Sequence, residues 1–295
     1  MPELPEVETV RRGLATLLPG RRISAITYDW PKGFPNAKTD VDTFLLGSQV
    51  VAVRRRAKVL IIDLSTGYSL IVHLKMTGQL VYVGNVGADR FGAGHPNDSL
   101  IGRLPDSSTR VVTTLADGAV LYFNDQRKFG WMKLVPTIEI PNIDFFKKVG
   151  PEPLSTTFNK ADFRSRFQRR KNTTIKAALL DQGVIAGVGN IYADESLWGA
   201  KIHPATLVKK VSPQKLNLLF DELQWVLRLA IEKGGSTNKN YVNAEGKPGS
   251  YMDFARVFRR EGQACPRCKT GIEKTRVAGR GTHICPKCQR YKALA

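Results

Sequence analysis

The sequence contains no long hydrophobic run and no secretion signal. None of its apolar stretches approaches the roughly 18 residues that a membrane-spanning helix requires. The first residues, MPELPEVE, are acidic and lack the basic and apolar regions of a signal peptide. We therefore expect a cytoplasmic protein, with no membrane among its partners.

Acidic residues are scarce relative to basic ones. The chain has 26 Asp plus Glu against 45 Lys plus Arg, a formal net charge of +19, and its pI is near 10.0. A surplus of this size points to a polyanionic partner, most commonly nucleic acid. A basic surface that serves only solubility is the alternative.

The hydrophobic pattern predicts a β-rich first domain. With 295 residues, of which 42% are hydrophobic, the chain can form two domains and a small appendage. After a first helix over about 3–17, residues 22–134 alternate between apolar and polar residues, which is typical of antiparallel strands in a sandwich or barrel. Residues 84–108 are rich in Gly, Pro, Asp and Ser, and we expect a long surface loop there.

The pattern becomes helical after a proline-punctuated connection at 136–150. Ser212 and Pro213 form an N-cap signal before an amphipathic helix that continues to Gly234. Two shorter helices, TTIKAALLDQG and NIYADESLWGA, are joined by GVIAGVGN, whose amides, with Asn190, are suited to bind a phosphate at the start of the second helix. An ordinary helical hairpin is the alternative. The Gly- and Asn-rich segment 234–250 is predicted to be a lid.

Cysteine is also scarce, and all of it lies near the C-terminus. The four cysteines form two C-x-x-C pairs with sixteen residues between them, a spacing that suits one tetrahedral structural zinc ion; disulfides are the alternative. The ligands are Cys265, Cys268, Cys285 and Cys288. Residues 265–295 hold eight Lys or Arg against one Glu, so a zinc-bound β-hairpin would place Arg280 against phosphate or in a groove.

Against this basic background, the first eight residues carry three glutamates and two prolines. Proline suits a first helical turn, and carboxylates suit the positive end of the helix dipole. This explanation accounts for the glutamates but not for Pro2. If the initiator Met is removed, Pro2 becomes a secondary amine with carboxylates one and four residues away, which is a possible nucleophile with acid–base partners.

Six motifs extend from Pro2 to Cys288: PELPEVE, RRRAK, HLKMTG, NDQRKFG, GVGNIYADE and the four-cysteine finger. Taken together, they resemble those of bacterial formamidopyrimidine-DNA glycosylases of the Fpg/Nei family. The resemblance implies a bifunctional glycosylase and AP lyase that excises oxidised purines from damaged duplex DNA and nicks the strand.

The resemblance also implies the catalytic residues. Pro2 corresponds to the nucleophile that forms a Schiff base with C1′ of the damaged nucleotide. Glu3 corresponds to the general acid toward the deoxyribose oxygen, and Glu6 to the carboxylate that orients the amine or carries protons. Lys58 matches a lysine that contacts the phosphate beside the lesion.

Four further residues are implied to contact DNA. His73 matches a histidine near backbone phosphate. Met76, Arg127 and Phe129 match the residues that fill the space left when the damaged base leaves the helix. Arg127 would pair with the orphaned cytosine.

The expected fold is α+β: an N-terminal helix with an antiparallel β-sandwich, then a helix-two-turns-helix domain with a C-terminal β-hairpin zinc finger. The expected divisions are a catalytic domain at 1–135, a linker at 136–150, a DNA-binding domain at 151–258 with a lesion-recognition loop at 234–250, and a finger at 259–295. We expect a monomer with one structural zinc ion. The alternatives are an endonuclease VIII-like glycosylase for oxidised pyrimidines and a non-catalytic zinc-finger DNA-binding protein.

Overall fold

The computed structural model describes residues 1–85, 89–236 and 251–291. The chain divides into two units, Met1–Lys147 with Lys233–Ser250, and Lys148–Glu232 with Tyr251–Ala295. Among the described residues, no helix has both the length and the apolar character that a bilayer crossing requires.

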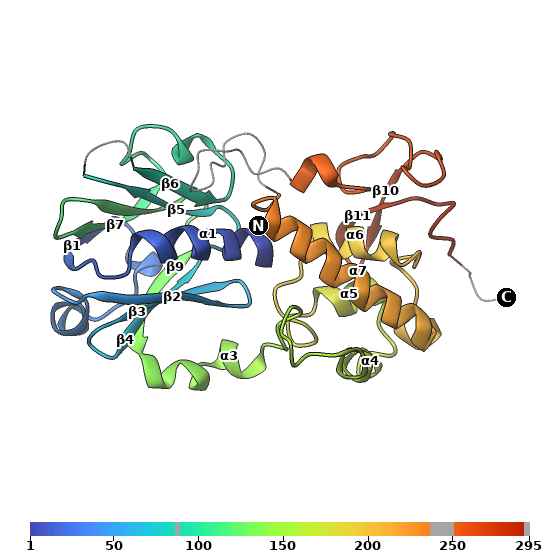
Figure 1. Ribbon diagram of the computed structural model, residues 1–295, viewed down its shortest axis with the longest axis horizontal. Helices are drawn as coiled ribbons and strands as arrows, with labels where there is room; N and C mark the ends of the chain where they lie inside the picture. The colour runs from blue at the N-terminus through green and yellow to red at the C-terminus, as the bar shows by residue number, and fades with distance from the viewer. Residues whose placement is uncertain (86–88, 237–250, 292–295) are drawn as a thin grey trace. The chain divides into compact units, whose positions relative to one another are not determined.

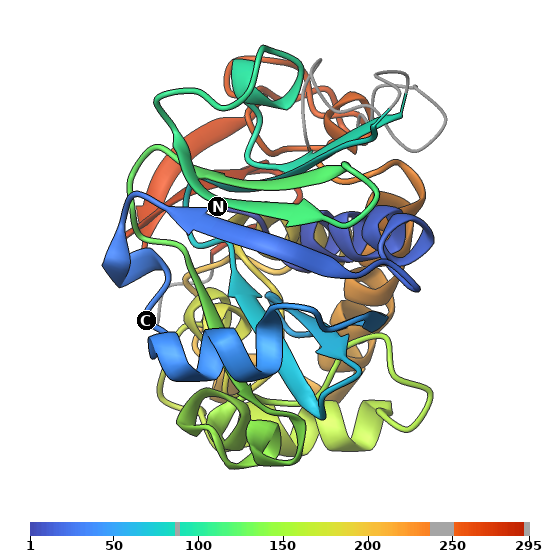
Figure 2. The same ribbon diagram turned by 90° about the vertical axis from the view of Figure 1, so that its left-hand side faces the viewer.

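The first unit consists of helix α1 and two antiparallel sheets, which confirms the predicted sandwich (Figures 1 and 2). Helix α1 spans Leu4–Leu17. In spatial order, the five-stranded sheet contains β1 (Ile23–Tyr28), β7 (Thr109–Leu115), β8 (Val120–Asp125), β5 (Gly78–Val83) and β6 (Arg90–Gly94). The four-stranded sheet contains β2 (Val50–Arg56), β3 (Val59–Leu64), β4 (Tyr68–His73) and β9 (Trp131–Pro136).

Short helices lie between these strands or, in the case of η4 and α3, follow the last of them. They are η1 (Pro31–Gly33), α2 (Lys38–Asp40), the π-helical η2 (Val41–Leu45), η3 (Asp98–Leu100), η4 (Thr137–Asn142) and α3 (Asp144–Lys148).

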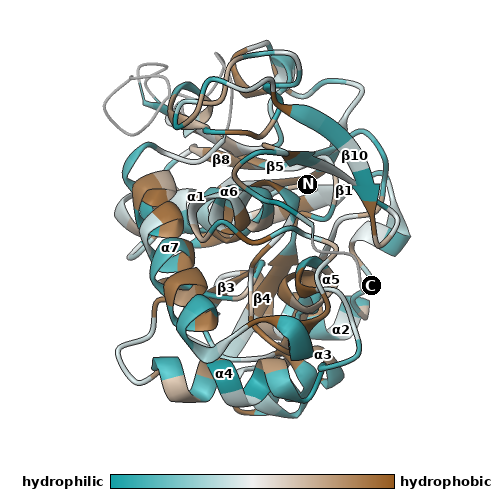
Figure 3. Cartoon of the chain, turned by 90° about the vertical axis from the view of Figure 1, so that its right-hand side faces the viewer, coloured by the Kyte–Doolittle hydropathy of each residue, from teal (hydrophilic) through white to brown (hydrophobic). Residues whose placement is uncertain are grey.

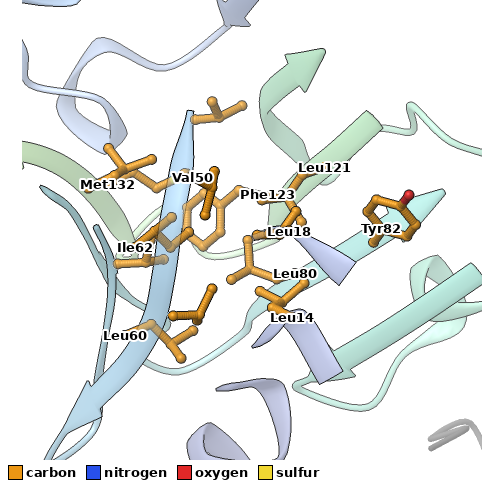
Figure 4. Packing of buried hydrophobic residues seen from close by; sticks show 14 of the residues in the cluster. Leu14, Leu18, Val50, Leu60, Ile62, Leu80, Tyr82, Leu121, Phe123 and Met132 are labelled. Atoms are coloured by element: carbon orange, nitrogen blue, oxygen red, sulfur yellow. The ribbon is translucent and has the colours of Figure 1, made fainter. Parts of the chain in front are cut away.

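The core of the first unit lies between the two sheets and against α1. Figure 4 shows side chains from α1, from β2 and β3, and from β5 and β8 meeting there. Helix α1 packs against β2 and β6, which are edge strands of the two sheets. The helix that begins at the proposed catalytic residues is therefore held by both sheets.

The structure corrects one prediction, because residues 84–108 are not simply a surface loop. Strand β6 lies within them, pairs with β5, and buries Phe91 and Ala93 in the core. The glycines that looked like loop residues permit close packing: a Cβ at Gly94 would lie 2.5 Å from the carbonyl oxygen of Gly78. Gly-rich sequence here reflects backbone crowding between neighbouring strands.

The second unit is helical, with a small β-hairpin. Its elements are α4 (Lys160–Gln168), α5 (Ile175–Leu180), α6 (Asn190–Gly199), η5 (Val208–Lys210), α7 (Pro213–Glu232), η6 (Tyr251–Phe254), β10 (Glu273–Val277) and β11 (Arg280–Ile284). The amide of Lys215 donates to Ser212 Oγ at 3.3 Å, which confirms the predicted N-cap of α7. In Figure 3 brown and teal patches alternate along α7, as its amphipathic sequence predicts, and β10 is largely teal.

We predict that Gly13→Ala destabilises the first unit, although alanine favours helix formation over glycine. A Cβ at Gly13 would lie 2.1 Å from Cζ of Phe91, a core ring that is 2% exposed. The overpacking should lower the free energy of unfolding by about 1–3 kcal/mol in a denaturant titration. The same substitution in a Phe91→Leu background should cost less. An unchanged or higher stability of Gly13→Ala would contradict this account of how α1 is held.

Candidate functional site

The first turn of α1 holds both carboxylates that the sequence singles out. Glu3 is the N-cap residue of the helix and Glu6 occupies the third helical position. The amide of Glu3 donates to Glu6 Oε2 at 2.8 Å, and both side chains are nearly buried, at 3% and 5% exposure. Pro2, also buried, directly precedes this turn. The helix dipole favours negative charge at this end.

The second carboxylate oxygen of Glu6 binds the backbone at Ser236, which is remote in sequence. Glu6 Oε1 accepts a hydrogen bond from the amide of Ser236 at 2.8 Å. Gly235 has a φ of +87°, and a Cβ there would lie 3.1 Å from the Glu6 side chain, so the backbone approaches this carboxylate as only glycine permits. The rest of the predicted lesion-recognition loop, residues 237–250, lies outside the described residues.

Lys58 directly precedes β3 and His73 ends β4, the neighbouring strand of the four-stranded sheet. Lys58 follows Ala57, a turn residue with a φ of 53°, in the hairpin between β2 and β3, and Val59 pairs with His73. This hairpin is fixed to α1 by an ion pair of 3.1 Å between Arg55 and Glu8. Burial opposes ionisation of Glu8, but Arg11 and Arg55 outweigh it and hold the pKa of Glu8 below its usual value.

His73 is a neutral hydrogen-bond donor. Burial, followed by the charges of Lys75 and Lys58, lowers its pKa from 6.5 to about 3. Its Nδ1 accepts a hydrogen bond from the amide of Lys75 at 3.0 Å. The proton of the neutral ring therefore resides on Nε2, which can donate to an anion.

Met76, Arg127 and Phe129 lie on two turns at one end of the five-stranded sheet. Met76 is 37% exposed and Phe129 is 52% exposed, although both are large and hydrophobic. The guanidinium of Arg127 lies over the Phe129 ring, 4.7 Å from its centroid. These side chains present apolar and cationic surface to solvent instead of burying it.

In the second unit, the structure brings Asn190 close to Arg280. Asn190 is the first residue of α6, and its Nδ2 donates to the carbonyl oxygen of Gly281 at 2.9 Å. Arg280 is exposed at the start of β11, next to that carbonyl. Amides at a helix N-terminus beside an exposed guanidinium are suited to bind phosphate.

A buried ion pair that the sequence analysis missed fastens the hairpin to the helices. Lys176 Nζ lies 2.6 Å from Asp194 Oδ1, and both side chains are fully buried. Lys176 also donates to Thr282 Oγ1 at 2.7 Å and to the carbonyl oxygen of Gly281 at 3.0 Å, while Asp194 Oδ2 accepts from the amide of His283 at 2.9 Å. Helices α5 and α6 and strand β11 meet at this pair.

The four cysteines form the predicted metal site. The Sγ atoms of Cys265, Cys268, Cys285 and Cys288 all lie within 4.8 Å of one another. The Cys268 and Cys285 sulfurs are 3.4 Å apart, too far for a disulfide bond. Four thiolates at this spacing fit one tetrahedral zinc ion, which is structural because every ligand position comes from the protein.

Comparison with known proteins agrees with this arrangement. Family models match the formamidopyrimidine-DNA glycosylase N-terminal domain over residues 1–132, the formamidopyrimidine-DNA glycosylase H2TH domain over 149–241, and the zinc finger found in FPG and IleRS over 262–290. A formamidopyrimidine-DNA glycosylase from Streptococcus pyogenes is 42% identical over 296 residues, covering 99% of this chain and 100% of the relative. One from Pelotomaculum thermopropionicum is 39% identical over 293 residues, with 99% and 100% covered.

Solved structures agree as well. Lactococcus lactis Fpg in complex with DNA containing an abasic site has a TM-score of 0.85 and 33% identity, with 98% of this chain and 100% of that chain covered. The same values hold for the L. lactis enzyme in complex with DNA containing N7-benzyl-Fapy-dG. Fold and site thus define an enzyme of base excision repair with a structural zinc finger. The chain belongs to the formamidopyrimidine-DNA glycosylase family.

We predict that His73 makes the first unit less stable in acid. The folded-state pKa of about 3 lies below the unfolded value of 6.5, so the unfolded chain takes up the proton first and stability falls as pH drops from 6.5 toward 3. Between pH 7 and pH 5 this amounts to about 2 kcal/mol. In denaturant titrations, His73→Gln should therefore lose less free energy of unfolding over that range than the wild-type protein does. Equal losses would mean that His73 is not held neutral.

Proposed function

We propose that this chain excises oxidised purines, 8-oxoguanine and formamidopyrimidines, from duplex DNA and then cleaves the strand by β,δ-elimination. The observation that carries this proposal is the first turn of α1, where two nearly buried carboxylates directly follow Pro2. Met1 is 48% exposed. Its removal would leave the secondary amine of Pro2 at the start of this turn.

The proposed reaction begins with attack of the Pro2 nitrogen on C1′. The glycosidic bond breaks and its electron pair leaves with the base, which takes up the proton that the attacking nitrogen loses. The deoxyribose ring then opens as O4′ takes a proton from Glu3, and the nitrogen lone pair forms the iminium. Loss of a proton from C2′ expels the 3′ phosphate, and a second elimination expels the 5′ phosphate.

Glu6 orients the amine through the backbone. Its Oε2 fixes the amide of Glu3, the residue directly after Pro2. Its Oε1 fixes Ser236, at the entrance to the proposed lesion-recognition loop 234–250. One carboxylate thus couples the position of the nucleophile to the segment proposed to grip the extruded base.

The remaining residues hold and deform the DNA. Lys58 contacts the phosphate beside the lesion, and His73 donates to backbone phosphate from its neutral ring. Met76, Arg127 and Phe129 enter the space that the extruded nucleotide leaves, with Arg127 donating to the orphaned cytosine. Asn190 and Arg280 grip phosphate from the second unit.

We further propose that the protein acts as a monomer on the chromosome in the bacterial cytoplasm. The proposed divisions are the catalytic domain 1–135, the linker 136–150, the helix-two-turns-helix domain 151–258 and the zinc finger 259–295.

Oxidised pyrimidines are a second candidate substrate class. The L. lactis enzyme has also been solved in complex with DNA containing an oxidised pyrimidine, with a TM-score of 0.83, 33% identity, and 98% of this chain and 100% of that chain covered. Excision from a panel of defined duplexes, each with one lesion, separates the two classes.

The nucleophile is tested by Pro2→Gly. We expect strongly reduced excision and lyase activity with DNA binding retained, because a primary amine replaces the ring-held secondary amine that forms the iminium directly. Borohydride should trap the unchanged protein covalently on lesion DNA. Pro5→Gly is the matched control, since Pro5 lies one turn further into α1, and it should trap normally. Full trapping and excision by Pro2→Gly, or by a form that retains Met1, would overturn the assignment.

Base reading and phosphate binding are separated by two arginine substitutions. Arg127→Ala should chiefly erode discrimination between cytosine and adenine opposite the lesion, by roughly 1–3 kcal/mol or about ten- to a hundred-fold. Arg280→Ala should weaken binding to every duplex by a similar factor and reduce its salt dependence. Excision rates and salt titrations measure both effects. A uniform loss in both variants would make Arg127 another phosphate contact.

A further inference from the structure

The two turns that carry Met76, Arg127 and Phe129 begin at one point of the five-stranded sheet. Gly78, the first residue of β5, pairs with Asp125, the last residue of β8. The turn with Met76 leads into β5 at this pair, and the turn with Arg127 and Phe129 follows β8. Positions about fifty residues apart in sequence therefore meet at a single rung of the ladder.

The Asp125 carboxylate, only 1% exposed, accepts four hydrogen bonds there. Its Oδ1 accepts from the Thr77 hydroxyl and from the amide of Arg127 at 3.2 Å. Its Oδ2 accepts from the amides of Phe129 at 2.8 Å and Gly130 at 2.6 Å. Two donors on each oxygen use all the lone-pair sites that a carboxylate offers.

Thr77 makes this cluster a link between the two turns. It directly follows Met76, and besides donating to Asp125 its Oγ1 accepts from the amide of Arg127 at 3.1 Å. The backbone of Asp125 is fixed in turn: its amide donates to the carbonyl oxygen of Ser108 at 2.7 Å, and its own carbonyl accepts from Arg110 Nε at 3.0 Å.

We propose that Asp125 and Thr77 are positioning residues that hold the Met76 turn and the 126–130 turn as one preassembled wedge. This inference rests on the proposed function of Met76, Arg127 and Phe129. Because both turns share one buried carboxylate, the three side chains enter the duplex as a unit, and their ordering is complete before DNA binds.

A carboxylate is required at this position because all four partners are donors. An asparagine at 125 would present its amide group to two of them, leaving buried donors facing one another. The backbone of Gly130 lies close to this carboxylate, because a Cβ there would lie 3.1 Å from Asp125 Oδ2 and 2.7 Å from the Phe123 ring. The wedge should therefore loosen when either member of the link is changed.

The test uses Thr77→Val, which keeps the shape of the side chain and removes the link, beside Asp125→Asn. Single-turnover excision from a lesion duplex should fall about ten-fold in both variants, and discrimination for cytosine over adenine should fall toward that of Arg127→Ala. Fluorescence of 2-aminopurine next to the lesion should report slower insertion. Thr77→Ser, which keeps the hydroxyl, should restore both readouts.

Two controls isolate positioning from general damage. Thr113→Val removes a buried hydroxyl from the same sheet that has no hydrogen-bond partner among the described residues, so it should leave excision unchanged. Borohydride trapping on a single-stranded abasic oligonucleotide, which has no opposite base to contact, should stay within about two-fold in every variant.

The decisive comparison combines Thr77→Val with Arg127→Ala. If Thr77 acts through the wedge, the double variant should discriminate between cytosine and adenine opposite the lesion as Arg127→Ala does, within about two-fold. Any of three results would overturn the proposal: normal excision by Thr77→Val, full additivity of the two losses of discrimination in the double variant, or a loss of single-stranded trapping as large as the loss of excision. Failure of the proposed function appears differently: Arg127→Ala itself would then keep its discrimination, whatever Thr77→Val does.

Discussion

The carboxylate of Glu6 is the constraint on which the proposed active site depends. It accepts hydrogen bonds from two backbone amides. One belongs to Glu3, about one turn earlier, and the other to Ser236, which follows α7 in the sequence. A carboxylate that accepts hydrogen bonds from two backbone amides at a helix N-terminus is held in position. The start of α1 thereby becomes rigid at the point where the chain would offer an amine. Because α1 also packs against the edge strands of both sheets, this start of the helix is fixed relative to the rest of the β-sandwich.

Local chemistry made part of this site predictable from the sequence. Proline and glutamate at a chain start indicate a helix N-terminus, and paired C-x-x-C motifs indicate zinc, because both depend on neighbours within a few residues. The adjacency of Lys58 and His73 depends instead on the register of β3 against β4. The sequence of β6 resembles a loop because its glycines allow close packing against the paired strand, which the sequence of one strand alone does not reveal.

Long-range polar contacts explain the rest of what the sequence did not show. Asp125 belongs to a recognisable motif, NDQRKFG, and its bonds to the following amides are local. Its link to Thr77 joins residues 48 positions apart and follows from strand order. Lys176 and Asp194 each resemble solvent-facing residues of short helices, and only the folded arrangement buries them together.

The Lys176–Asp194 pair has an evolutionary consequence. Removing one member leaves an uncompensated charge in the interior, whereas replacing both with apolar residues of similar volume is often neutral. The two positions should therefore change together among relatives, as a correlated pair eighteen residues apart. Thr282 and the backbone of the zinc hairpin share the same ammonium group, so the correlation should extend to β11. Covariation among these positions would then identify the contacts that attach the zinc hairpin to α5 and α6.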